Sequence, residues 1–106
     1  MATFVFDIDG TICTDTKGDY PSAKPFSDRI KLINKLYSDG HQIIFYTARG
    51  MGRSDNNIEI ASSNWKALTL SQLEDWGVKY NQLFMGKPAG DVYIDDKAEY
   101  DFKFFS

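Results

Sequence analysis

Short apolar runs recur along the chain and predict four β-strands. The run at 3–8 is typical of a strand that is buried on both faces of a parallel sheet. The run at 42–46 predicts a second buried strand, and the runs at 81–85 and 91–94 predict a third and a fourth.

Longer segments between these runs predict two helices. Apolar residues recur at helical spacing over 26–37 with polar residues between them, which predicts an amphipathic helix that is closed by Gly40. A second helix is expected to end at Trp76, just before Gly77. Its start is open among three candidate caps: Asn57, Ser62 and Thr69, the last with Gln72 three residues later.

Two segments show neither pattern and are expected to be loops. The polar stretch at 12–25 predicts a surface excursion, and the glycine-containing stretch at 50–57 predicts a mobile loop. The order strand, helix, strand, helix, strand, strand indicates an α/β fold with a mainly parallel sheet of about four strands flanked by helices. The 106 residues suit a single domain that spans 1–106.

Composition and charge narrow the classes of protein. Twelve Lys and Arg against fifteen Asp and Glu give a net charge of −3, which excludes a globally basic nucleic-acid-binding protein. The longest apolar runs are far too short to cross a bilayer, so no membrane partner is expected. The single cysteine, Cys13, favours a reducing compartment, and Asp7 and Asp9 interrupt any signal-peptide pattern. We therefore expect a cytoplasmic protein.

Residues that carry chemistry follow each of the four predicted strands. Because ligands of such sheets bind outside the carboxyl ends of the strands, these residues should meet at one edge. Each feature alone is commonly structural, since Asp-Gly-Thr after a strand is often an ordinary turn. Together they place four acids, two hydroxyls and a lysine at that edge, in the segments 7–11, 47–49, 86–87 and 95–96.

This set of side chains suits phosphoryl transfer. Carboxylates that gather at one edge repel one another unless a cation or a proton intervenes. Hard oxygen ligands favour Mg²⁺, which commonly binds a few carboxylates together with a substrate phosphate. Lys87 and Thr47 would contribute a positive charge and a hydroxyl to an anionic group, and Asp95 and Asp96 would complete the metal site.

The two aspartates after the first strand have different expected roles. Asp7 is the candidate nucleophile, which would form an aspartyl-phosphate. Asp9 lies two residues further on, so it projects to the same side of an extended backbone and can serve as the acid and base. Gly10 allows a sharp turn and a close approach of the backbone to phosphate.

The chain resembles the haloacid dehalogenase (HAD) superfamily, whose four motifs are matched in order from residue 3 to residue 98. The matching residues are DIDGT at 7–11, IIFYT at 43–47, Lys87, and VYIDD at 92–96. Within the superfamily, the segments 47–50, 85–88 and 93–98 are similar to small phosphatases of bacterial capsule biosynthesis.

The resemblance implies a Rossmann-like core, a Mg²⁺ cofactor, Asp7 as nucleophile and Asp9 as acid and base. The implied metal ligands are the Asp7 side chain, the main-chain carbonyl of Asp9 and an acid of the Asp95–Asp96 pair. The residues expected to contact phosphate or substrate are Gly10, Thr11, Ala48 and Arg49. No folded cap fits into 12–25 or 50–63, so the site is expected to be open to water, or to be completed by a second copy of the chain.

Three functions follow from these residues, in order of preference. The first is a Mg²⁺-dependent phosphomonoester hydrolase that acts through an aspartyl-phosphate on a small metabolite, such as a sugar phosphate of capsule or polysaccharide biosynthesis. The second is a nucleotide or polynucleotide-end phosphatase. Only three basic residues, Arg49, Arg53 and Lys17, are available there to bind the phosphates of a nucleic acid. The third is a non-enzymatic phospho-acceptor like a receiver domain, although receivers phosphorylate an aspartate in mid-chain rather than one at the first strand.

Overall fold

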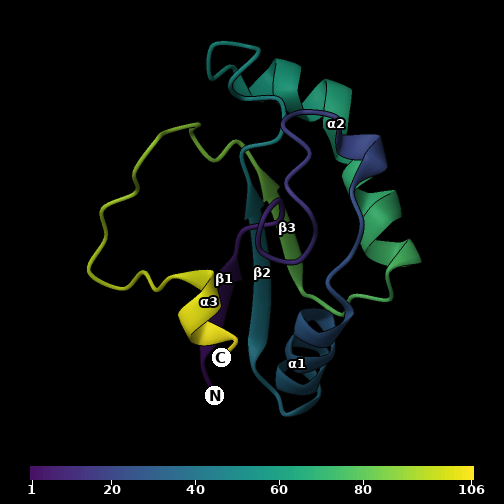
Figure 1. Cartoon of the computed structure of the whole chain (residues 1–106), viewed down its shortest axis with the longest axis vertical. Coiled ribbons are helices and arrows are strands. Elements are labelled where there is room, and N and C mark those ends of the chain that lie inside the picture. The colour runs from purple at the N-terminus through teal and green to yellow at the C-terminus, as the bar shows by residue number, and fades with distance from the viewer.

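A parallel sheet of three strands organises the computed structural model, which describes residues 1–106 (Figure 1). The strands are β1 (Thr3–Phe6), β2 (Gln42–Thr47) and β3 (Gln82–Met85), and β2 lies between the other two. Phe6 pairs with Phe45, and Thr47 pairs with Met85. Because all three strands run the same way, their carboxyl ends meet at one edge of the sheet, as the sequence predicted.

Two helices cover one face of this sheet. They are α1 (Ser27–Ser38), between β1 and β2, and α2 (Ile58–Asp75), between β2 and β3. Both connections join neighbouring parallel strands in the same direction, so right-handed crossovers place both helices on the same side, as Figure 1 shows. The side chain of Asn57 accepts a hydrogen bond from the Ile60 amide, which identifies Asn57 as the cap of α2 among the three candidates.

The hydrophobic core lies between the sheet and these helices. Phe6, Ile43 and Phe45 face Ile33 of α1 and Leu73 of α2, and all five side chains are buried. The core also takes in the start of the segment after β1, because Ile8, Ile12 and Cys13 are fully buried. The prediction of a surface excursion from residue 12 onward is therefore wrong for its first two residues. The segment reaches the surface after them and forms a short 3₁₀ turn, η1 (Tyr20–Ser22).

The opposite face of the sheet is not covered. Val5 of β1 is 60% exposed and Phe84 of β3 is 48% exposed, so the prediction that the first strand is buried on both faces is wrong. The reason is that both helices pack on the other side and no later element returns to this one. An open apolar hollow of about 380 Å³ remains on this face, lined by Val5, Ile44, Tyr46, Ile58, Phe84, Met85 and Gly86.

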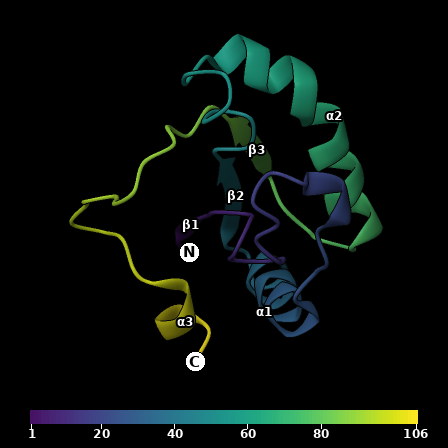
Figure 2. The ribbon, with the colours of Figure 1, turned by 45° about the horizontal axis from the view of Figure 1, so that its top comes forward.

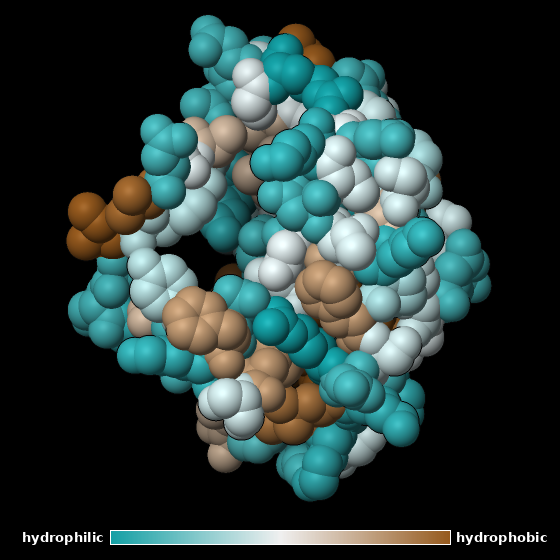
Figure 3. Space-filling view, viewed as in Figure 1, coloured by the Kyte–Doolittle hydropathy of each residue, from teal (hydrophilic) through white to brown (hydrophobic).

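The segment at 91–94 does not form the predicted fourth strand. Val92 is 74% exposed and Ile94 is 95% exposed, and neither residue pairs with the free edge of β1. Figures 1 and 2 show that the chain between β3 and residue 100 stays apart from the sheet in both views. Its projecting apolar side chains are the brown group at the left of Figure 3. An apolar run becomes a strand only when a neighbouring strand pairs with it, and here none does.

The C-terminal residues return to the sheet beside β1. The short helix α3 (Asp101–Phe104) places Phe104 and Phe105 against Phe4 and Phe6, with ring centroids 5.5–5.9 Å apart. Phe104 and Phe105 therefore cover the edge of the core, whereas Phe102 is 59% exposed.

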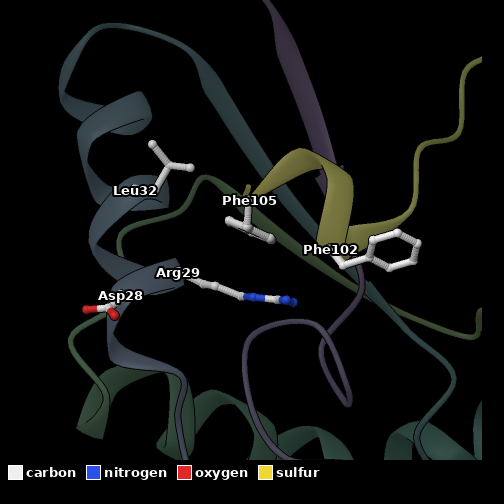
Figure 4. A pocket seen from close by; sticks show the side chains of 5 residues that line it. All are labelled: Asp28, Arg29, Leu32, Phe102 and Phe105. Atoms are coloured by element: carbon white, nitrogen blue, oxygen red, sulfur yellow. The ribbon is translucent and has the colours of Figure 1, made fainter.

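An ion pair also ties α3 to α1. Arg29 of α1 extends toward α3, as Figure 4 shows, and its Nη1 pairs with the carboxylate of Asp101 at 2.6 Å. The two helices border an open pocket of about 270 Å³, whose lining is Asp28, Arg29, Leu32, Phe102 and Phe105. None of the helices combines the length and the apolar character that crossing a bilayer requires.

Two matched substitutions test this division of buried and exposed apolar residues. Ile33→Ala should lower the free energy of unfolding by about 2–5 kcal/mol, because it leaves a cavity in the core. Ile94→Ala should change it by less than about 0.5 kcal/mol, because that side chain is almost fully exposed. Denaturant unfolding of both variants is the measurement. A loss at Ile94 comparable to that at Ile33 would show that 91–94 is buried after all.

Candidate functional site

Three of the four predicted strand ends meet, as the sequence predicted. The Lys87 amide, two residues after β3, donates a hydrogen bond to the Thr47 carbonyl at the end of β2 at 3.1 Å. The Lys87 ammonium lies 3.8 Å from the carboxylate of Asp7, directly after β1. A nucleophile candidate and a cation therefore reach toward each other from the two outer strands, across the end of the central one.

Asp7 lies in a setting that disfavours its charge. Burial raises the pKa of Asp7, and the nearby Lys87 and the Ile8 amide lower it, with burial the larger effect. Its side chain still keeps 36% of its surface accessible, so the carboxylate can be reached from outside. Asp7 is thus a partly desolvated carboxylate beside a cation at the open edge of a sheet, which suits a nucleophile.

Asp9 has a different partner, Arg49. The Arg49 Nε donates to one oxygen of Asp9 and its Nη2 donates to the other, each at 3.0 Å. The Arg49 side chain is 0% exposed, and its remaining nitrogen is bonded to α2. The expectation that Arg49 contacts substrate is therefore not supported, because its guanidinium is enclosed and already bonded on all three nitrogens.

The other expected phosphate-binding residues lie at the same edge of the sheet. Gly10 has φ +81°, a conformation that a side chain would strain, and its amide donates to the Cys13 carbonyl. The Thr11 amide donates to the Ile8 carbonyl. Both amides are thus bonded within the turn that follows β1. Ala48 is half-buried between Thr47, whose hydroxyl accepts a hydrogen bond from the Arg49 amide, and Arg49 itself.

The acidic pair lies apart from these residues. Asp95 and Asp96 are exposed in the segment between β3 and α3, and the Asp95 carboxylate accepts a hydrogen bond from the Lys97 amide at 2.9 Å. That hydrogen bond, followed by one from Asp96, lowers the pKa of Asp95. No three His, Cys, Asp or Glu side chains gather closely enough to hold a metal ion. The expected grouping of Asp7, Asp9, Asp95 and Asp96 is therefore not assembled here, because the strand that should have delivered the pair is not formed.

A second group of residues, not anticipated from the sequence, surrounds Arg49. Gln72 and Thr69 of α2 accept hydrogen bonds from its Nη1 at 2.6 and 3.2 Å, and the ring of Tyr20 lies 5.0 Å from its guanidinium carbon. The signal was present in the sequence, because Thr69 and Gln72 are polar residues three positions apart within a helix. The same spacing is compatible with one of the three candidate helix caps, but in the structure it places both side chains on one buried face of α2.

Arg53 is the remaining basic residue near this group. Its guanidinium carbon lies about 5 Å from the rings of Tyr20 and Trp65, and it donates to the Gly18 carbonyl. Arg53 is exposed, unlike Arg49, so it is the arginine of this region that an incoming anion could meet.

Comparisons with known proteins establish the fold over the whole chain and name no activity. No protein-family model matches the chain, and no curated protein matches it. The chain is similar to the crystal structure of an MCSG target from Vibrio cholerae, with 28% sequence identity and a TM-score of 0.91. The alignment covers all of this chain and 89% of that one. A small parallel sheet flanked by helices is thus an arrangement that the two chains share.

The raised pKa of Asp7 predicts a cost in stability that depends on pH. The folded state binds the Asp7 proton more tightly than the unfolded state, so ionisation of Asp7 destabilises the fold as pH rises above the ordinary value of 3.8. Asp7→Asn should therefore raise the melting temperature at pH 7, and the gain should vanish below about pH 3.8. Thermal unfolding across this pH range measures it.

A matched control for Asp7 has the opposite sign. Lys35 lowers the pKa of Asp39 through a hydrogen bond, so Asp39→Asn should lose a little stability at pH 7 and none in acid. A loss of stability for Asp7→Asn at pH 7 would contradict the effect of burial that we describe.

The single cysteine should be unreactive in the folded protein. Cys13 is fully buried, and burial, followed by the nearby Asp9, raises its pKa to about 12. Because only the thiolate reacts, iodoacetamide should leave the native protein unmodified up to about pH 10 and label it fully in concentrated urea. Mass spectrometry of the intact chain provides the measurement, and rapid labelling of the native protein would contradict the buried position.

Proposed function

We propose that this chain is a phosphomonoester hydrolase of the haloacid dehalogenase type, with Asp7 as its nucleophile. The observation that supports it most is the approach of Lys87 to Asp7 at 3.8 Å across the carboxyl end of the sheet. A phosphate that meets Asp7 there would also meet the Lys87 ammonium, which would neutralise part of its charge. Asp9, two residues later, adds the group needed for proton transfer.

In the first step, the Asp7 carboxylate attacks phosphorus. A bond forms between the Asp7 oxygen and phosphorus, and the bond to the leaving oxygen breaks. The electron pair stays on the leaving oxygen, which takes a proton from Asp9. The products of this step are an alcohol and an aspartyl-phosphate on Asp7.

In the second step, Asp9 acts in the opposite direction. Its carboxylate accepts a proton from a water molecule, whose oxygen attacks the phosphorus atom of the aspartyl-phosphate. The bond between phosphorus and the Asp7 oxygen breaks, which regenerates the Asp7 carboxylate and releases phosphate. Lys87 stays beside the transferring group in both steps, and the buried Thr47 hydroxyl, which accepts a hydrogen bond from the Arg49 amide, lies at the neighbouring strand end.

The metal requirement remains a prediction. In this structure the carboxylate of Asp7 faces Lys87, and the Asp95–Asp96 pair lies elsewhere, so the predicted ligands do not fit a Mg²⁺ ion as they stand. We therefore derive no step through the metal. Mg²⁺ and the acidic pair stay in the proposal because the predicted ligands are hard oxygen atoms, which Mg²⁺ prefers.

The proposed substrates are small phosphorylated metabolites, with sugar phosphates of polysaccharide or capsule biosynthesis first. Asp7 is partly accessible, and no folded cap lies over it, because the segments after β1 and β2 are a loop with one 3₁₀ turn and a turn-rich loop. Nucleotides and 3′- or 5′-phosphorylated oligonucleotides are the alternative, since an open edge would admit them as well.

Asp7→Asn should abolish turnover. A screen of sugar phosphates, nucleotides and end-phosphorylated oligonucleotides, with Mg²⁺ and with EDTA, should show phosphate release by the wild type in Mg²⁺ only. The variant should lose at least about 10³-fold of that rate, because the amide is a poor nucleophile.

Asp15→Asn is the matched control for this screen. It changes an exposed aspartate of the excursion and should keep the wild-type rate. Substantial activity of the Asp7 variant would rule out Asp7 as nucleophile. A stable aspartyl-phosphate on the wild type, without turnover, would favour the receiver-like alternative.

A further inference from the structure

We propose that Arg49 is a positioning residue, which holds the Asp9 carboxylate in the orientation needed for both proton transfers. This inference rests on the proposed function, in which Asp9 is the acid and base. It assigns a role to a buried arginine that the proposed steps do not otherwise use. The argument depends on how completely the Arg49 side chain is bound, and by what.

The contact between Arg49 and Asp9 is a two-point contact. Nε and Nη2 each donate to a different oxygen of the same carboxylate, at 3.0 Å. Parallel hydrogen bonds from a planar guanidinium fix the plane of the carboxylate as well as its distance. A single donor, such as a lysine ammonium, would leave the carboxylate free to rotate about its own axis. The structure therefore shows a contact that controls orientation.

The guanidinium is itself fixed from the side opposite Asp9. Its Nη1 donates to the Gln72 amide oxygen and the Thr69 hydroxyl, both on α2. The Gln72 amide nitrogen donates in turn to the Tyr20 carbonyl at 2.8 Å, so this side chain is also held at both ends. Arg49 thus connects the Asp9 carboxylate to α2 and, through Gln72, to the segment after β1.

Asp9 needs such support because of where it lies. It follows β1 and precedes Gly10, which turns the chain sharply with φ +81°. Its side chain is 20% exposed, and both oxygens of its carboxylate accept hydrogen bonds from Arg49. The remaining neighbour of its carboxylate is the Cys13 thiol at 3.6 Å, which is a weak donor. A displacement of about 1 Å in a group that transfers a proton can cost about 10²-fold in rate.

The test separates the two chemical steps by the choice of leaving group. In p-nitrophenyl phosphate the leaving group departs as a stable anion, so the first step needs little help from Asp9. In butyl phosphate the leaving alkoxide needs a proton. The second step is the same for both substrates. Rapid-mixing kinetics in the presence of Mg²⁺ therefore report the two proton transfers separately.

Arg49→Lys keeps the charge and removes the two-point contact. With p-nitrophenyl phosphate we expect a burst of about one nitrophenolate per chain, followed by a steady rate about 10²-fold below that of the wild type. With butyl phosphate we expect a similar or larger loss and no burst. Asp9→Asn should behave in the same way, and the double variant should be no slower than Asp9→Asn alone, because both changes remove the same function.

Arg29→Lys is the matched control. Arg29 also pairs with an aspartate, Asp101 at 2.6 Å, and lies near the aromatic rings of Phe26 and Phe105. Its replacement should lower the melting temperature without producing a burst. Gln72→Met is a second test variant, for the case in which Arg49→Lys does not fold. It leaves the Arg49–Asp9 contact in place, removes the shorter of the two hydrogen bonds from Arg49 to α2, and should give a smaller burst of the same kind.

The outcomes distinguish this inference from the function on which it rests. If the wild type releases phosphate from neither substrate, the proposed function fails, and the role of Arg49 fails with it. If the wild type is active and the folded Arg49 and Gln72 variants keep its steady rate, the proposed function stands and this inference is overturned. A loss of steady rate without a burst when p-nitrophenyl phosphate is the substrate also overturns it, because that pattern indicates general disruption rather than misplacement of Asp9.

Discussion

The buried contact between Arg49 and Asp9 is the interaction on which the arrangement of the site depends. It joins the end of β2 to the turn after β1, and through Gln72 it reaches α2 and the segment at Tyr20. A guanidinium enclosed in a protein interior is tolerated only when carboxylate and polar acceptors surround it. Removal of one partner of such a pair typically costs about 3–5 kcal/mol, because the other charge is left buried and unpaired. The contact between Arg49 and Asp9 thus stabilises the packing of α2 against the sheet and also fixes the position of the Asp9 carboxylate.

Asp7 and Asp9 are only two residues apart, yet the fold treats them differently. Asp9 is held by two hydrogen bonds from one cation, whereas Asp7 has a looser approach from Lys87 at 3.8 Å and remains partly accessible. A nucleophile must be free to bond to its target, and a proton-transfer group must be held in place. This difference in restraint supports the proposed division of roles independently of the order of motifs along the chain.

The ends of β1, β2 and β3 were predictable from the sequence. The position of the Asp95–Asp96 pair was not, because the strand expected before it does not form. An apolar run followed by polar residues predicts a strand that ends at a surface, and parallel pairing then brings the ends of β1, β2 and β3 together. The run at 91–94 carries the same local signal, but Val92 and Ile94 remain exposed. The hydrophobic pattern of a segment does not show whether that segment pairs with a neighbouring strand, because pairing depends on the path of the intervening chain.

The order β1, α1, β2, α2, β3 could be read from the sequence alone, as could the edge of the sheet at which Asp7, Asp9, Thr47 and Lys87 lie. The three-dimensional fold was needed to show that Arg49 is enclosed, that Thr69 and Gln72 bind it, and that Asp95 and Asp96 lie apart from Asp7. The physical reason is the range of the interactions. Periodicity and turn chemistry act between neighbours in the chain, whereas a buried charge finds its partners among residues 20 to 40 positions away.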